Sequence, residues 1–190
     1  TVKGDTDQVL GEEMPRLAEI VRSGGDILAA LSQAVARFAS IPTNRVERRP
    51  IVGIVGEIYV RNNTFASEDV IRAVEQAGGE AWMTPVGEWM LYVSSPANQR
   101  QQNGAFDRRT LRAYPNYWWM KHWEHRLYAA AGPSLADRHE PSVEAVVASG
   151  RRLLPVNIGG EAVLIVGRTM AFKQQGASLV VNCSPFGCMP

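Results

Sequence analysis

Two cysteines near the end of the sequence are the residues best suited to redox or metal chemistry. Cys183 and Cys188 are five positions apart and follow the apolar run Leu179 to Val181. That run comes after Gly176 and predicts a short strand that is buried on both faces. Ligands bind at the carboxyl ends of the strands in an open parallel sheet. A thiol that follows such a strand therefore lies where its chemistry is useful.

The number of thiols limits what these cysteines can bind. An iron–sulfur cluster usually takes four cysteine ligands, and a zinc site takes closely spaced pairs such as Cys-x2-Cys. Two cysteines complete neither. Cys188, in a turn between Gly187 and Met189, is the better ligand candidate, whereas Cys183 is expected to be a small buried residue at a strand end. A chain of 190 residues with no export signal does not need a disulfide, so we expect both thiols to be reduced.

The elements that must position these residues begin with the apolar run Ile51 to Val60. It predicts a buried strand that ends near Gly56, and Ser67 is expected to cap a helix that runs to Ala77. Glu80 to Met83 predicts the next strand, so the segment is a β-α-β unit with parallel pairing. Gly53 and Gly56 form only a Gly-x-x-Gly, which excludes the three-glycine dinucleotide fingerprint. The predicted fold class is α/β, a small parallel Rossmann-like sheet flanked by helices, helix-rich and an incomplete domain.

Several other side chains are expected near the carboxyl ends of the strands. Glu57 and Arg61 follow the first strand, and they either face a ligand crevice or form an ion pair with each other; both interpretations stay open. His139 either begins a helix or donates a proton in a cleft. Glu161 opens the predicted helix Ala162 to Gln174. Phe186 lies in the cysteine loop and completes the crevice candidates.

Glycine and proline positions add three expectations about the helices. Gly167 in the middle of helix 162–174 costs about 1 kcal/mol relative to alanine unless a neighbouring backbone packs against it. Pro141 is expected to be the first residue of a helix that ends at Ala148. Pro115 is expected to divide residues 105–131 into two helices. On the second of these, Trp119 lies on a predicted buried stripe, while Trp118 widens the apolar surface toward a neighbouring domain or a bound organic group, with the domain contact favoured.

Residues 1–45 are predicted to be a helical N-terminal extension, and residues 46–190 an α/β domain that ends in the cysteine loop. Within the extension, Asp26 is expected to cap a helix over Ile27 to Phe38. The sequence begins without methionine and stops after the cysteine loop, so we expect a piece of a longer polypeptide. His122 and His125 lie three apart, but the helical metal motifs are missing and solvated histidines are favoured.

Composition restricts the partners. The sequence has 45% hydrophobic and 21% charged residues with a net charge of +1. This balance gives no electrostatic reason to expect nucleic acid or an anionic membrane surface. No apolar run approaches the ~20 residues that span a bilayer, and the polar N-terminus lacks a signal-peptide core. The predicted location is the cytoplasm.

Two segments carry a resemblance to a known family. Asn182-Cys-Ser-Pro-Phe-Gly-Cys-Met-Pro190 resembles the cluster-proximal loop of the 2-hydroxyacyl-CoA dehydratase and benzoyl-CoA reductase family, in particular its activase-related proteins. Pro50-Ile-Val-Gly-Ile-Val-Gly-Glu-Ile-Tyr-Val-Arg-Asn62 is similar to the segment that opens the corresponding domain in those proteins. The similarity covers about residues 45–190.

The resemblance implies a function in anaerobic metabolism. Members of this family hold a [4Fe-4S] cluster with cysteines from different domains, and the enzymes use a low-potential electron, delivered by an ATP-hydrolysing activase, to form a ketyl radical on an acyl-CoA. It implies Cys188 as a cluster ligand and Cys183 as an outside candidate, with the remaining ligands supplied from elsewhere. The implied partners are other domains or subunits of a dehydratase or activase system, and an acyl-CoA. The chain holds no complete active site of its own, and it lacks the glycine loop of the activase ATPase.

Two alternatives stay open. The chain could be a non-catalytic α/β interaction module with a buried cysteine loop and an aromatic docking helix. It could also be a thiol enzyme that uses Cys188 with His139, which requires a thiol of lowered pKa.

Overall fold

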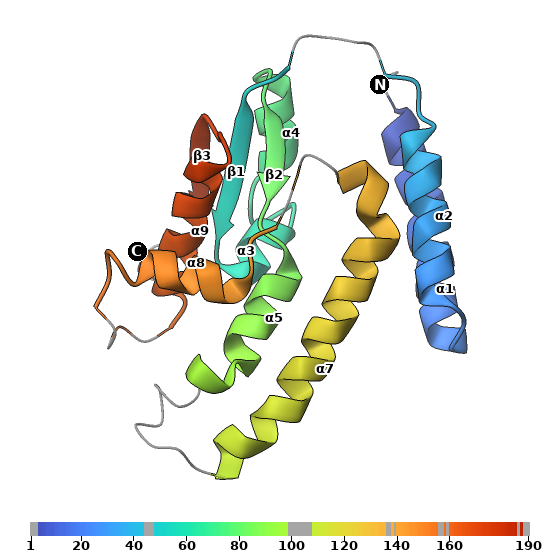
Figure 1. The fold of residues 1–190 in the computed structure, drawn as a ribbon. Coiled ribbons are helices and arrows are strands. Elements are labelled where there is room, and N and C mark those ends of the chain that lie inside the picture. Colours follow the sequence, from blue (N-terminus) through green and yellow to red (C-terminus); the bar gives the residue numbers. More distant parts are fainter. Residues whose placement is uncertain are drawn as a thin grey trace. The chain divides into compact units, whose positions relative to one another are not determined.

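A computed structural model describes residues 4–43, 48–98, 108–135, 138, 140–155, 158, 160–185 and 187. The strands are β1 (Ile51–Gly56), β2 (Glu80–Met83) and β3 (Leu179–Cys183). The helices are α1 (Asp5–Ser23), α2 (Ile27–Ala39), α3 (Ile58–Asn62), α4 (Val70–Gln76), α5 (Val86–Ser94), α7 (Arg108–Ala131), α8 (Val143–Gly150) and α9 (Ala162–Gln174), with a 3-10 turn at Gly132–Leu135. Figure 1 shows these elements along the chain. The predicted α/β class, helix-rich with a small parallel sheet, is confirmed.

The chain forms two compact units. One contains residues 1–47 and 119–140, and the other contains residues 48–118 and 141–190. The predicted division near residue 45 therefore differs from these units in the segment 119–140, which groups with the N-terminal helices.

In the second unit, β1 is the central strand of a parallel sheet with the order β2-β1-β3 (Figure 1). The register places Gly53 opposite Trp82 on one side and opposite Val180 on the other. Because parallel partners point to the same face, these three residues form one row across the sheet. Phe172 of α9 covers this row, and its ring lies edge-on to that of Trp82 at 5.3 Å.

Gly53 is required by this contact. A Cβ atom at that position would lie 2.5 Å from Cδ2 of Phe172, which is far inside van der Waals distance. Phe172 is fully buried and forms the core of the α9 face with Val55 and Ile165. The ring of Phe172 thus occupies the space that a side chain on Gly53 would fill.

The helices α8 and α9 approach each other through two glycines. A Cβ atom on Gly167 would lie 2.0 Å from the carbonyl oxygen of Val146, and one on Gly150 would lie 2.0 Å from the carbonyl oxygen of Val163. The backbone of α8 therefore packs against Gly167, and this contact explains the glycine in the middle of α9. The contact fixes α9, and with it the residues at its N-terminal end.

Three helix predictions are wrong: the start of the helix after Ser67, the start of the helix at Pro141, and the break at Pro115. A short helix, α3, begins directly after β1, and α4 begins at Val70 rather than after Ser67. Ser142, not Pro141, is the N-cap of α8, because its hydroxyl accepts a hydrogen bond from the backbone N–H of Ala145. Pro115 lies inside the continuous helix α7 and does not divide it.

Two burial predictions are also wrong. β3 is an edge strand in the described sheet, and Leu179 is 58% exposed rather than buried on both faces. Trp119 is 61% exposed and does not belong to a buried stripe.

In the first unit, α1 and α2 are held together by a buried carboxylate. Glu13 is ion-paired with Arg16 at 2.8 Å and also with Arg37 of α2. Arg16 donates a further hydrogen bond to the carbonyl oxygen of Ala30 at 3.1 Å. The predicted N-cap Asp26 is confirmed, since its carboxylate accepts bonds from the first backbone N–H groups of α2.

Candidate functional site

The candidate site lies at the carboxyl end of β1. The sheet continues from β1 to β2 on one side and to β3 on the other, and such a switch in strand order is where open parallel sheets bind ligands. Gly56 has a φ of 124°, and a Cβ atom there would lie 2.2 Å from the carbonyl oxygen of Cys183. That same oxygen accepts a 3.0 Å hydrogen bond from the backbone N–H of Glu57. Only glycine permits this close junction of β1 with the cysteine-bearing strand.

Arg61 is the buried cation of the site. It lies on α3, is 5% exposed, and donates from Nη1 to the carbonyl oxygen of Gly56 at 3.4 Å. Its Nε has no hydrogen-bond partner among the described residues. Burial lowers the pKa of Arg61, while the carboxylates of Glu88 and Glu161 act in the opposite direction. The guanidinium is thus held near two acids with few direct hydrogen bonds.

Glu57 is a helix cap rather than the partner of Arg61. Its Oε2 accepts a 2.8 Å hydrogen bond from the backbone N–H of Val60 and so begins α3. Among the described residues, no ion pair joins Glu57 to Arg61.

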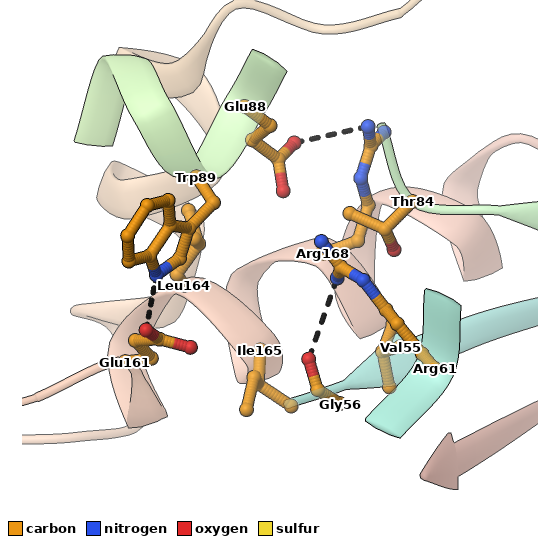
Figure 2. A pocket seen from close by; sticks show the side chains of 10 residues that line it. All are labelled: Val55, Gly56, Arg61, Thr84, Glu88, Trp89, Glu161, Leu164, Ile165 and Arg168. Atoms are coloured by element: carbon orange, nitrogen blue, oxygen red, sulfur yellow. Dashed lines mark hydrogen bonds and ion pairs between the residues drawn. The ribbon is translucent and has the colours of Figure 1, made fainter. Parts of the chain in front are cut away.

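The opposite wall comes from α5 and α9 (Figure 2). Arg168 of α9 is 1% exposed and pairs with Glu88 of α5 at 3.0 Å. Glu161, which precedes α9, accepts a hydrogen bond from the indole N–H of Trp89. Thr84 follows β2, and both its hydroxyl and its backbone N–H donate to the carbonyl oxygen of Ile54. Polar contacts therefore join α5 to the N-terminal half of α9, and the end of β2 to β1.

The space enclosed by these residues is small. The cavity is about 10 Å³ in volume, and that is room for about one water molecule. Two cations, Arg61 and Arg168, face two anions, Glu88 and Glu161, so the lining is balanced in charge. As arranged, the site can hold water or a single small polar group.

The structure brings together some of the residues predicted for the crevice. Arg61 and Glu161 both line the cavity, whereas Glu57 caps α3 outside it. His139, Phe186 and Cys188 lie outside the described residues.

The sequence analysis missed Glu88 and Arg168. Arg168 lies within the otherwise apolar buried face of α9. An isolated charge at such a position could have identified it as a site residue. Its partner on α5 is 80 positions away, a pairing that no local pattern indicates.

Cys183 is the described thiol of the cysteine loop. It is half-buried, and burial raises its pKa, while the nearby cation Arg61 acts in the opposite direction. The thiol is therefore mainly protonated at neutral pH, which does not favour a nucleophile.

Among the residues that the structure describes, no group of three or more His, Cys, Asp or Glu side chains is placed to hold a metal ion. His122 and His125 of α7 are both exposed. Within the described ranges, no helix is long and apolar enough to cross a membrane.

Comparisons with known proteins leave the family open. A scan against protein-family models and searches of the curated proteins and of the solved structures found no match for this chain.

Proposed function

We propose that this chain is a domain of a 2-hydroxyacyl-CoA dehydratase-like or activase-like protein and that it contributes a ligand to an iron–sulfur site for low-potential electron transfer. The observation that carries the proposal is the place where β3 ends. β3 ends at Cys183 beside the end of β1, at the switch in strand order where an open parallel sheet binds its ligands. The resemblance of residues 182–190 to the cluster-proximal loop supports the same location.

The described residues do not fit a complete cluster. They contribute one thiol, Cys183, and burial favours its protonated form, whereas a cluster ligand is a thiolate. The proposal therefore takes Cys188 as the principal ligand and the other ligands from outside this chain.

Arg61 gives the site a further property that suits this proposal. Its charge opposes the effect of burial on the pKa of Cys183. A buried cation beside the strand end would also favour any negative group held by the loop. The 3.0 Å hydrogen bond from the backbone N–H of Glu57 fixes the carbonyl of Cys183, and thereby the point at which the loop begins.

A second candidate function is a non-catalytic α/β interaction module. The closed crevice favours it, because the buried pair Glu88 and Arg168 and the bond between Trp89 and Glu161 fill the space that a substrate would need. In this module the cysteine loop is merely buried, and the aromatic helix α7, with Trp118 64% exposed, is the docking surface.

The test is the iron and acid-labile sulfide content of the protein, purified anaerobically from the cells that make it naturally. Cys188→Ser is compared with Cys183→Ser, which is matched in chemistry and differs only in position. The dehydratase-like proposal expects iron and sulfide in near-equal amounts in the parent and their loss in Cys188→Ser. A protein free of iron and sulfide would refute it and leave the interaction module.

A further inference from the structure

A second hollow lies in the same unit, away from the crevice at the end of β1. It is bounded by the end of α5 and the segment that follows it on one side and by α8 on the other, and its volume is about 420 Å³. Sites for small molecules commonly measure about 300–1,000 Å³. This hollow therefore has the size of a ligand site, in contrast to the one-water cavity.

Its floor is apolar. Val143 and Val147 lie one helical turn apart on α8, and Ala148 follows on the same side. The buried ring of Tyr92 forms the facing wall. These groups offer a surface on which an aliphatic or aromatic body can be removed from water.

The walls are fixed by hydrogen bonds, so the hollow is formed before any ligand arrives. The hydroxyl of Tyr92 donates to the carbonyl oxygen of Gly160 at 2.6 Å. Tyr117 of α7 donates to the carboxylate of Glu144, near the start of α8. A preformed site loses less free energy to ordering when it binds.

Asn98 supplies the hollow with a hydrogen-bond acceptor. Its side chain is 8% exposed, and its amide nitrogen donates to the carbonyl oxygen of Tyr92 at 3.2 Å. Its amide oxygen accepts no hydrogen bond in the part of the chain that the structure describes, and this oxygen is not fully buried. A ligand in the hollow with an N–H or O–H donor could therefore bond to it.

Arg151 gives the hollow a cationic end. It follows α8 directly and lies seven positions after Glu144, which corresponds to two turns, or about 10 Å, along the helix. The carboxylate of Glu144 accepts a hydrogen bond from Tyr117 near the start of α8, and its distance from Arg151 weakens its repulsion of an anion bound there. A carboxylate is the group that a guanidinium binds best.

We infer that this hollow binds a small carboxylic acid that has an apolar body and an N–H donor, such as an N-acylated apolar amino acid. The carboxylate pairs with Arg151, the N–H donates to the amide oxygen of Asn98, and the apolar body covers Val147. The inference is independent of the proposed iron–sulfur function, because it uses none of the residues at the end of β1.

The test compares three probes by calorimetry and by amide shifts of the ¹⁵N-labelled full chain. N-acetyl-L-phenylalanine has all three features; N-acetyl-L-phenylalaninamide lacks the carboxylate, and 3-phenylpropanoate lacks the N–H. For about 15 non-hydrogen atoms we expect a dissociation constant of about 1 mM or lower for the first. Loss of the carboxylate should weaken binding about tenfold and loss of the N–H about fivefold. The shifts should centre on Val147 and Ala148.

Two variants locate the site. Val147→Trp fills the hollow and should abolish binding, whereas Met90→Trp, on an exposed position of α5 outside it, should not. Arg151→Gln should weaken N-acetyl-L-phenylalanine about tenfold and leave the uncharged amide unchanged. The inference is overturned if no probe binds, if all three bind equally, or if binding survives Val147→Trp. Equal losses of both probes in Arg151→Gln would also overturn the role of that residue.

Discussion

The substitution Gly167→Ala tests the packing that positions α9. An added Cβ would lie 2.0 Å from the carbonyl oxygen of Val146, whereas real Cβ atoms essentially never come within 3.0 Å of such an atom. The obstacle is backbone, which has no rotamer to change, so α8 and α9 must separate by about 1 Å at this point.

The expected size follows from two opposing effects. Overpacking a close contact usually costs about 1–3 kcal/mol, and alanine is favoured over glycine within a helix by about 1 kcal/mol. The difference between these effects is at most about 2 kcal/mol, and because the required separation is large we expect a net destabilisation near that value. For a chain of this size that lowers the melting temperature by roughly 4–8 °C.

The assay is urea and thermal unfolding, with amide hydrogen exchange to assign the change to α8 and α9. Gly11→Ala is the matched control, since Gly11 is also inside a helix but has nothing within 4 Å of the added carbon. The control should stabilise the α1–α2 unit by about 1 kcal/mol. If Gly167→Ala is as stable as the parent or more so, the close α8–α9 contact is refuted.

Three further substitutions or titrations test the sheet and the crevice. Gly53→Ala should destabilise by about 1–3 kcal/mol in urea unfolding, because its Cβ meets the ring of Phe172; an unchanged midpoint would contradict that contact. Glu88→Gln should cost about 3–5 kcal/mol by removing the carboxylate that pairs with buried Arg168, and the double variant Glu88→Leu, Arg168→Met should recover most of it; no recovery would contradict a direct coupling between the two residues. The alkylation rate of Cys183, followed by peptide mass spectrometry, should reach half its maximum above the ordinary thiol pKa of about 8.5. Because burial favours the neutral thiol, the contribution of Cys183 to stability is complete at pH values below its pKa in the unfolded state. This contribution is lost as the pH rises through its pKa in the folded state. Half-maximal alkylation below pH 8 would contradict the effect of burial on this pKa.

Local sequence patterns were sufficient to predict features that depend on a single helix or strand. The bounds of α9 and the N-cap Asp26 of α2 follow from periodicity and capping residues. The strands β1 and β2 follow from short apolar runs between turn signals. Gly167 could be recognised as a packing position because a mid-helix glycine needs a reason.

The features that were not predicted depend on tertiary contacts, which local sequence patterns do not reveal. α3 is five residues long, too short to show a period, and it exists because Glu57 caps it at the end of β1. Pro115 stays inside α7 although it removes a hydrogen bond, so the helix tolerates that loss. The Glu88–Arg168 pair joins residues that only the fold brings together, which is why two of the four charged residues that line the crevice were missed.

EPR tests whether Cys188, in the cysteine loop that follows β3, is the iron–sulfur ligand that we propose. The spectrum of the natively produced, anaerobically purified protein is recorded after reduction for the parent, Cys183→Ser and Cys188→Ser. We expect a reduced-cluster signal in the parent that disappears in Cys188→Ser. A parent without any cluster signal, or a signal unchanged in both variants, would contradict it.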